Sequence, residues 1–347
     1  MEPINNPASP FSPTRCDWDA VPPNARLTVR EETAASALTH NDSPDIPYRW
    51  SVNPYRGCQH GCAYCYARRT HEYLDLGAGT DFDHTIIVKT NAAELLATEL
   101  ARPRWRREWI ELSGVTDAYQ PLERHYRLTR RCLEVCVARG NPVGVTTKSA
   151  LVTRDLDLLA ELHRRAAAQV FISATFADDR VARLLEPMTA TADARFEAMR
   201  RIAEAGVPVG VLIAPVIPGL NDRDIPALLT RAAECGATSA CFTPVRLPGS
   251  VAEVFLTRLR AAFPQAADRI EARIRDLRGG RLNDPRLGCR MEAHGAYWDG
   301  IRRLFETTAT RVGLAGGQSW RCGPAPADPR QAKQLELFHQ DIPPRGT

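Results

Sequence analysis

The sequence lacks the features that mark membrane and secreted proteins. No run of apolar residues approaches the ~20 residues that span a bilayer, and the N-terminus contains no apolar core of a signal peptide. The ten cysteines are not spaced as the disulfide framework of a small secreted domain. We therefore expect reduced thiols and a cytoplasmic protein without a membrane segment.

Lysine and net charge are also scarce. Only Lys89, Lys148 and Lys333 are lysines among 45 basic residues, so a lysine is an exception wherever it occurs. The net charge of +4 does not by itself indicate a nucleic-acid-binding protein. With 44% hydrophobic and 25% charged residues, the 347-residue chain has the composition of a globular protein that buries a large core.

Three cysteines lie within eight residues. Cys58, Cys62 and Cys65 have the spacing Cys-x3-Cys-x2-Cys, and no fourth cysteine follows nearby. Because closely packed thiolates repel one another unless a cation neutralises them, we expect a metal site, with an iron–sulfur cluster as the first candidate. A structural zinc or a fully ligated cluster needs four protein ligands, so three leave one metal position open to a small molecule. The alternatives are a partial zinc site and ordinary buried thiols.

Beyond this loop, short apolar segments alternate with helical patterns. Residues 49–55 are expected to form a short strand before the loop, and further strands are expected at 85–89, 109–113, 143–147, 170–173, 207–213 and 239–243. Each of these further strands is followed by a predicted helix, within 91–100, 126–137, 155–165, 192–205, 225–235 and 251–263. This order predicts a parallel sheet with right-handed crossovers. Six or seven units are too few for an eight-stranded barrel, so we predict an open, partial (β/α)6 barrel.

The two ends of the chain do not follow this alternation. Residues 1–45 are rich in Pro, Asn, Ser and Thr, and we expect a disordered or surface-wrapping arm. We assign 46–276 to the barrel core and 277–312 to a C-terminal extension with a helix at 293–311. Residues 313–347 are predicted to be a flexible tail.

The cysteine spacing, with Tyr64 directly before the third cysteine, resembles the signature of radical S-adenosylmethionine (radical SAM) enzymes. The resemblance implies that Cys58, Cys62 and Cys65 hold a [4Fe–4S] cluster whose fourth iron binds SAM. It further implies one-electron cleavage of SAM to a 5′-deoxyadenosyl radical, with an electron donor such as flavodoxin or ferredoxin. The partial barrel is also the fold that the resemblance implies.

Polar residues at the ends of predicted strands are candidates for the SAM site, because functional residues of βα barrels collect there. Lys148 is suited to the SAM carboxylate, Asp117 with Thr116 to its amine, and Ser173 to its ribose. The alternatives are that Thr116 and Asp117 cap the next helix and that Ser173 only permits close packing. The scarcity of lysine makes a purely structural role for Lys148 harder to accept.

Within the superfamily, segment 51–58 together with 62–66 resembles the spore photoproduct lyase group of DNA repair enzymes. The similarity extends over about residues 50–263 and implies that Tyr64 and Tyr66 take part in radical chemistry on a thymine lesion. The alternative is that both tyrosines only pack beside the cluster. The chain departs from the group at Gly114, where the resemblance would place a hydrogen-donating cysteine.

Two further segments suggest partners. Gln334, Leu335, Leu337 and Phe338 belong to a pentapeptide that looks like the motif by which bacterial repair proteins bind the sliding clamp. The alternative for this segment is the last turn of an amphipathic helix. Residues 102–109 interleave arginines with tryptophans, which suits either a nucleic-acid contact or a solvated helix end.

Three functions therefore remain open from the sequence. The first is a lyase-like radical SAM enzyme that repairs a DNA lesion at the clamp. The second is a radical SAM enzyme that modifies RNA or a peptide. The third is a non-catalytic iron–sulfur sensor, which would release no 5′-deoxyadenosine.

Overall fold

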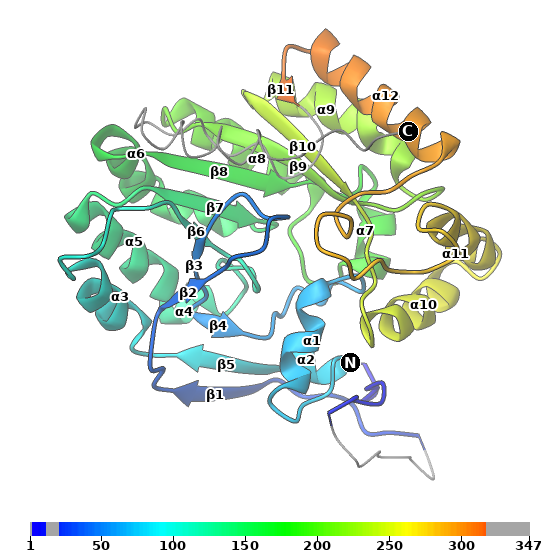
Figure 1. Cartoon of the computed structure of the whole chain (residues 1–347), viewed down its shortest axis with the longest axis horizontal. Coiled ribbons are helices and arrows are strands. Elements are labelled where there is room, and N and C mark those ends of the chain that lie inside the picture. The colour runs from blue at the N-terminus through cyan, green and yellow to red at the C-terminus, as the bar shows by residue number, and fades with distance from the viewer. Residues whose placement is uncertain (1, 12–20, 317–347) are drawn as a thin grey trace, which may run out of the picture.

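One large sheet organises the molecule. The computed structural model describes residues 2–11 and 21–316 (Figure 1). The sheet has the strand order β11-β10-β9-β8-β7-β6-β3-β2, and its neighbouring strands are parallel except for β2 and β3. The strands are β2 (Leu38–His40), β3 (Trp50–Val52), β6 (Ile110–Leu112), β7 (Val143–Thr147), β8 (Ala168–Ser173), β9 (Val209–Val216), β10 (Ser239–Pro244) and β11 (Ala315–Gly316). This arrangement confirms the predicted open, partial barrel.

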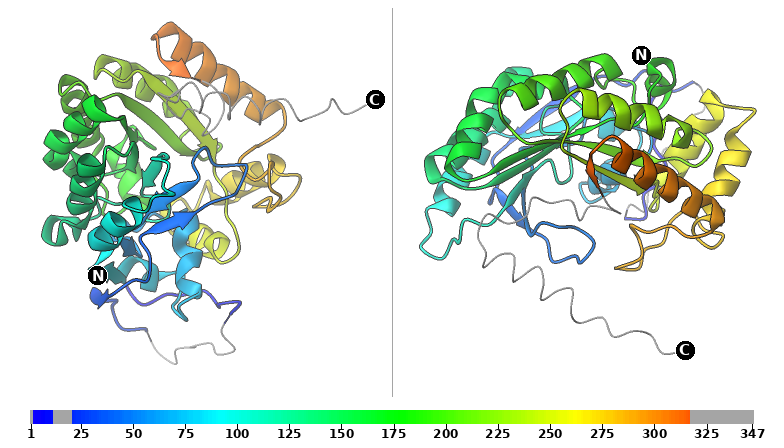
Figure 2. Two further views of the ribbon diagram at one scale, coloured as in Figure 1. Left: turned by 60° about the vertical axis from the view of Figure 1, so that its left-hand side comes forward. Right: turned by 90° about the horizontal axis from the view of Figure 1, so that it is seen from above.

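Helices cover the outer face of the sheet, as Figures 1 and 2 show. They are α3 (Ala92–Leu100), α5 (Leu128–Arg139), α6 (Leu156–Arg165), α8 (Ala192–Glu204), α9 (Ile225–Glu234) and α12 (Ala296–Arg311). The largest apolar cluster lies between these helices and the sheet. Ile110 and Leu112 of β6 belong to this cluster, and strand alternation turns Glu111 to the inner face.

Local sequence signals set several helix ends. The Thr191 side chain accepts a hydrogen bond from the Ala194 amide at 3.2 Å and caps α8. Pro226 occupies the first turn of α9, where no intrahelical amide donor is needed. Gly140 ends α5 with a φ of 58°, a left-handed conformation that side chains other than glycine rarely adopt.

A second layer of helices lies on the inner side, around the cysteine loop (Figure 1). It contains α7 (Asp179–Leu185), α10 (Val251–Ala262) and α11 (Ala267–Asp276), together with the short helices α1 (Arg69–Glu72), α2 (Thr80–His84) and α4 (Glu123–Tyr126). Phe255 and Ile270 of this layer share an apolar cluster with Cys62, Ala63 and Tyr64. The sequence analysis missed α7 and α11.

The strand at 85–89 does not belong to the barrel, which corrects one predicted unit. β5 (Thr85–Lys89) forms a separate three-stranded sheet with β1 (Thr28–Glu32) and β4 (Tyr55–Arg56). Its Ile86 and Val88 pack with Tyr55 and Leu128 in a small core of their own. The barrel therefore contains six strands, β3 and β6 to β10, and the first crossover runs from β3 through the cysteine loop and α3 to β6.

The described part of the N-terminal arm wraps the surface. Glu99 of α3 accepts hydrogen bonds from the amides of Ala37 and Leu38 at 3.3 and 2.8 Å. Asn91 is the N-cap residue of α3, but its side chain bonds the backbone of Ala34, at 2.9 and 3.0 Å, instead of the helix. The arm thus adds β1 and β2 to the two sheets.

The clamp-like residues Gln334, Leu335, Leu337 and Phe338 lie outside the described residues, and the division into four segments stays a prediction. Among the described residues, no helix combines the length and the apolar character needed to cross a membrane.

Candidate active site

The three cysteines lie on a tight loop between β4 and the 3₁₀ turn Tyr66–Arg68. Cys58 and Cys62 are buried, and Cys65 is partly buried. Gly57 and Gly61 have φ values of 78° and 67°. A Cβ added at Gly57 would stand 2.8 Å from the Thr85 carbonyl oxygen, so the loop requires glycine at this position.

Gln120 fixes the backbone on both sides of Cys58. Its side-chain oxygen accepts from the Gln59 amide at 3.1 Å, and its side-chain nitrogen donates to the Gly57 carbonyl at 3.2 Å. The side chain is completely buried. Sequence reasoning missed Gln120 because its partners lie about 60 residues away and no local pattern links them.

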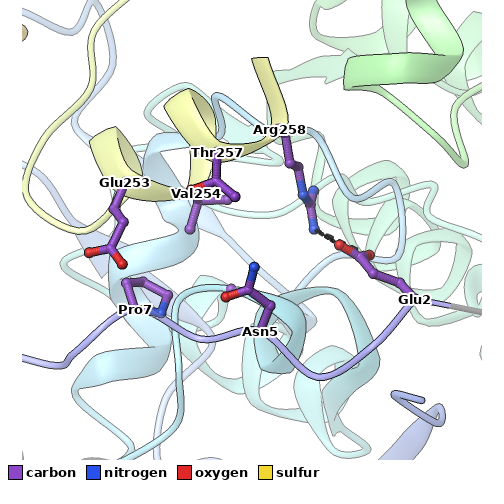
Figure 3. A pocket seen from close by; sticks show the side chains of 8 residues that line it. Glu2, Asn5, Pro7, Glu253, Val254, Thr257 and Arg258 are labelled. Atoms are coloured by element: carbon purple, nitrogen blue, oxygen red, sulfur yellow. Dashed lines mark hydrogen bonds and ion pairs between the residues drawn. The ribbon is translucent and has the colours of Figure 1, made fainter. Parts of the chain in front are cut away.

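A buried arginine supports the other end of the loop. Arg68 donates to the carbonyls of Cys62 and Gly61 at 2.9 and 3.0 Å, and it pairs with Asp83 at 2.9 Å. Arg258 of α10 reaches the same Gly61 carbonyl at 2.6 Å and the same Asp83 at 2.8 Å. Figure 3 shows Arg258 also meeting Glu2 of the N-terminal arm, at 3.0 Å. The arm, α10 and the loop are therefore joined through charged groups.

Tyr64 points into a closed polar network. Its hydroxyl donates to the carboxylate of Glu186, a residue with no exposed surface. Arg195 donates to the other oxygen of Glu186 at 2.5 Å. Burial alone would raise the pKa of Glu186, but Arg195 and Lys148 outweigh it and hold that pKa well below its usual range. No sequence pattern pointed to Glu186, because its partners Tyr64, Lys148 and Arg195 come from three other parts of the chain.

Lys148 follows β7 and reaches across the carboxyl edge of the sheet. Its ammonium lies 3.3 Å from Thr175 Oγ1, 3.3 Å from the Ala214 carbonyl and 3.8 Å from Glu186. It also stands 5.8 Å from the ring centre of Tyr64. The structure thus brings Lys148 to the ends of β8 and β9 and next to the cysteine loop.

Asp117 connects the cysteine loop to the strand ends. One carboxylate oxygen accepts from Thr147 Oγ1 at 2.6 Å and from the Tyr119 amide at 2.9 Å. The other accepts from the Lys148 amide at 2.8 Å and lies 3.3 Å from His60 Nδ1. Burial would raise the pKa of Asp117, yet His60 and these hydrogen bonds lower it to about 2. Because a carboxylate has about four acceptor positions, this one is fully occupied.

Thr116 and Ser173 are both buried and bonded to the protein. The hydroxyl of Thr116 donates to the Tyr55 carbonyl at 3.3 Å. The carbonyl of Ser173 accepts from Arg195 at 2.9 Å, which joins the end of β8 to the Glu186 network. Both residues lie at the edge that carries Asp117 and Lys148, as the sequence predicted.

Tyr66 faces the other way from Tyr64. It is 40% exposed, its hydroxyl donates to the Gly114 carbonyl at 2.5 Å, and the Arg246 guanidinium lies 4.6 Å from its ring centre. Gly114 itself approaches Ser51 closely, since an added Cβ would stand 3.0 Å from Ser51 Cβ. The position where the resemblance would place a cysteine is thus occupied by backbone that binds Tyr66.

The chemistry of the three thiols fits an iron cluster. Burial raises the pKa of Cys58, and nearby Asp117, Cys62 and Cys65 add to this effect, so the thiol stays neutral without a cation. Bound iron reverses this balance, because thiolates are its ligands. In the part of the chain that the structure describes, no three side chains converge on a single metal ion. A cubane makes a different demand, since each thiolate binds a separate iron atom.

The family follows from comparison with known proteins. A model of the Radical SAM superfamily matches residues 52–232, which contain the cysteine loop and the four barrel strands β6 to β9. The chain belongs to the radical SAM superfamily, and its cofactors are therefore a [4Fe–4S] cluster and SAM.

Two kinds of relative are similar to the chain. An uncharacterized protein of Mycobacterium tuberculosis is 40% identical over 248 residues, which cover 70% of this chain and 72% of the relative. An uncharacterized protein of Methanocaldococcus jannaschii is 28% identical over 57% of this chain and 71% of the relative. Among solved structures, spore photoproduct lyase complexed with dinucleoside spore photoproduct has a TM-score of 0.57 at 17% identity, over 84% of this chain and 82% of that chain. At this identity, the likeness shows the fold alone.

Proposed function

We propose that this radical SAM enzyme acts on nucleic acid and reverses a DNA lesion by a lyase-like reaction. The observation that carries the proposal is the pair of tyrosines around Cys65, one enclosed with Glu186 and one exposed beside Gly114. The likeness in fold to spore photoproduct lyase, which has been solved with a dinucleoside photoproduct, supports the same substrate class. Under this proposal, Tyr64 and Tyr66 are catalytic residues.

We assign Cys58, Cys62 and Cys65 as the cluster ligands. When bound, the cluster and SAM supply a 5′-deoxyadenosyl radical after one electron arrives from a donor such as flavodoxin or ferredoxin. Lys148 supplies a cation for the SAM carboxylate, because its ammonium lies at the strand ends beside the loop, 3.3 Å from Thr175 Oγ1 and from the Ala214 carbonyl.

The remaining SAM-site candidates act more indirectly. Asp117 holds His60 of the cysteine loop against the Lys148 backbone, and its acceptor positions are occupied, so we assign it a positioning role. Thr116 donates its hydroxyl to the Tyr55 carbonyl and keeps its acceptor positions for the SAM amine, and we assign Ser173, at the end of β8, to the ribose.

The reaction is tested by anaerobic incubation of the reconstituted enzyme with SAM, dithionite and ultraviolet-irradiated DNA, followed by mass spectrometry. We expect 5′-deoxyadenosine together with restored thymidine. Release of 5′-deoxyadenosine with unchanged DNA would instead favour RNA or a peptide as the substrate. If no 5′-deoxyadenosine formed under any condition, the chain would be a sensor rather than an enzyme.

The role of Lys148 is tested by its replacement with alanine. Lys148→Ala should weaken SAM binding about 10-fold or more in equilibrium dialysis, because a partly buried charge pair is lost. Lys89→Ala, at a lysine of β5 in the separate sheet, is the matched control and should leave SAM affinity unchanged. Equal loss of stability and SAM affinity in Lys148→Ala would make this lysine structural.

A tether to the replication machinery is a separate part of the proposal. The pentapeptide that contains Gln334, Leu335, Leu337 and Phe338 has the side chains of a clamp-binding peptide, with an apolar pair and a hydrogen-bonding glutamine. Replacing Leu337 and Phe338 with alanine should abolish retention on immobilised sliding clamp. Unchanged retention would remove this tether and leave the reaction untouched.

A further inference from the structure

A group of arginines surrounds the exposed side of the cysteine loop. Arg246 lies in the loop between β10 and α10, and the C-terminal extension contributes the others, which are Arg278, Arg281, Arg286 and Arg290. We call these five residues the arginine strip. Three carboxylates accompany them, namely Asp45, Asp284 and Glu292. The strip therefore carries an excess of positive charge next to the candidate active site.

The carboxylates do not neutralise the arginine nearest the cysteine loop. Asp45 pairs with Arg290 at 2.6 Å, and Asp284 pairs with Arg286 at 2.6 Å. Among the described residues, Arg246 and Arg281 have no ion pair and no side-chain hydrogen bond. The Arg246 guanidinium is stacked on Tyr66, a contact that uses its flat face and leaves its in-plane N–H donors available.

Arg278 holds the strip together rather than offering its own charge. Its guanidinium donates twice to the Val245 carbonyl, at 2.9 and 3.2 Å, directly before Arg246. It also donates to the Arg290 and Glu292 carbonyls at 3.3 and 3.1 Å. Burial and the nearby Arg246 lower the pKa of Arg278 to about 10, so the two guanidinium groups repel each other. The fold keeps these like charges close, and an anion between them would relieve the repulsion.

The outer end of the strip is hollowed. Arg278, Gly279, Arg281, Asp284 and Arg286 line a surface pocket. A row of positive groups thus leads from Tyr66, next to Cys65, through Arg246 to this pocket. Guanidinium groups in a row match phosphates repeated along a strand better than they match a single small anion.

We propose that Arg246 and Arg281, positioned by Arg278, bind successive phosphates of a nucleic-acid strand and lead that strand across Tyr66 to the active site. This assignment rests on the proposed function, because it names how that same site receives its substrate. The proposal does not include the arginines of segment 102–109. That segment precedes β6, so it lies at the opposite edge of the parallel sheet from the strand ends that carry Asp117 and Lys148.

The test compares two double variants of the reconstituted enzyme. Arg246→Gln with Arg281→Gln removes the two free charges of the strip, and Arg104→Gln with Arg106→Gln is the matched control at the opposite edge. Binding of a fluorescein-labelled 12-nucleotide thymidine strand is followed by anisotropy between 50 and 200 mM salt, roughly the range over which phosphate contacts respond. Circular dichroism verifies folding, and Arg246→Lys with Arg281→Lys retains the charge if the glutamine pair unfolds.

The strip variant should bind at least about 10-fold more weakly at low salt, with a salt slope smaller by roughly 1.4, or 0.7 for each lost phosphate contact. The control variant should match the wild type both in strand binding and in 5′-deoxyadenosine formation without nucleic acid. The proposal would be overturned if the wild type, the strip variant and the control variant bound the strand equally well. It would also be overturned if the wild type bound an oligoglutamate peptide as tightly as the strand. If the wild type bound no strand at all, the proposed function itself would fail.

Discussion

The two sides of Cys65 are built on opposite principles. On the Tyr64 side, Glu186 lies between Arg195 and Lys148, and its pKa is held low. On the Tyr66 side, the buried Glu111 has no cationic partner among the residues that the structure describes, and burial raises its pKa to about 7 against hydrogen bonds from Thr146 and Trp109. Near neutral pH, Glu186 is therefore fully ionised, whereas a large share of Glu111 is still protonated.

This difference separates two tasks. A network whose buried polar groups are hydrogen-bonded to one another has one low-energy arrangement, so it orients the groups around the cofactors. A surface that keeps unpaired guanidinium groups is stabilised when an anion arrives. The first side is suited to a constant cofactor and the second to a substrate that enters and leaves.

The largest effect is expected at the boundary of the two sides. Cys65→Ala removes one of the proposed cluster ligands and should lower bound iron and 5′-deoxyadenosine formation by roughly 100-fold or more. Cys136→Ala is the matched control, because Cys136 is a buried cysteine of α5, which covers the outer face of the sheet. Iron content and nucleoside yield of the anaerobically reconstituted variants provide the measurement. An iron content in Cys65→Ala equal to that of the wild type would mean that Cys65 is not a cluster ligand.

The next effect is on stability. Glu186→Ala leaves the Arg195 guanidinium buried without its carboxylate and should cost about 3–5 kcal/mol of unfolding free energy. Arg246→Ala removes a half-buried arginine with no ion pair among the described residues and should change it by about 0.5 kcal/mol or less. Urea denaturation of the apo proteins measures both. Similar losses in the two variants would contradict the contrast between a closed and an open side.

Much of the barrel could be predicted, because apolar strands and helices leave local patterns. The cysteine spacing located the loop, and the scarcity of lysine pointed to Lys148. What failed was long-range: residues 85–89 have the pattern of a strand, but that pattern does not reveal which sheet the strand joins. Asn91 precedes a helix as a cap would, yet its amide binds Ala34 of the arm.

The same limit applies to the candidate site. Gln120 and Glu186 act only through partners that folding brings to them from other elements. A buried polar residue has no periodic signature, so neither could be distinguished from a surface residue in the sequence. Tyr64 and Tyr66 were predicted together, but their opposite environments appear only when Glu186 and Gly114 are in place.

The charge state of Glu111 gives a pH dependence. Its pKa is about 7 in the folded chain against 4.5 in the reference state, so its stabilising effect is complete below pH 4.5 and is lost as pH rises through 7. The loss amounts to about 3 kcal/mol. The groups around it are Thr146, Trp109 and the phenols of Tyr48 and Tyr66, none of which is a cation.

Glu111→Gln keeps the shape of the side chain but removes its ionisable group. The variant should therefore lose the pH dependence of the unfolding free energy that Glu111 causes. The difference between the urea unfolding free energies of the wild type and the variant, measured from pH 5 to pH 8, isolates it from other groups. A difference that stays constant over this range would mean that Glu111 is ionised in the folded chain, and the two sides would then be alike in charge.

The smallest effect separates the two tyrosines. Tyr64→Phe removes a hydrogen bond to a buried carboxylate and should cost about 1.5–3 kcal/mol, whereas Tyr66→Phe loses one bond to an exposed-side carbonyl and should cost about 0.5–1.5 kcal/mol. Activity need not follow this order, because a phenol that takes part in radical chemistry is lost in either variant.

Thermal unfolding measures how much each phenol contributes to stability. Product yield from irradiated DNA measures how much each contributes to the reaction. A variant stable as the wild type but inactive would identify a catalytic phenol; two active variants would leave both tyrosines with packing alone.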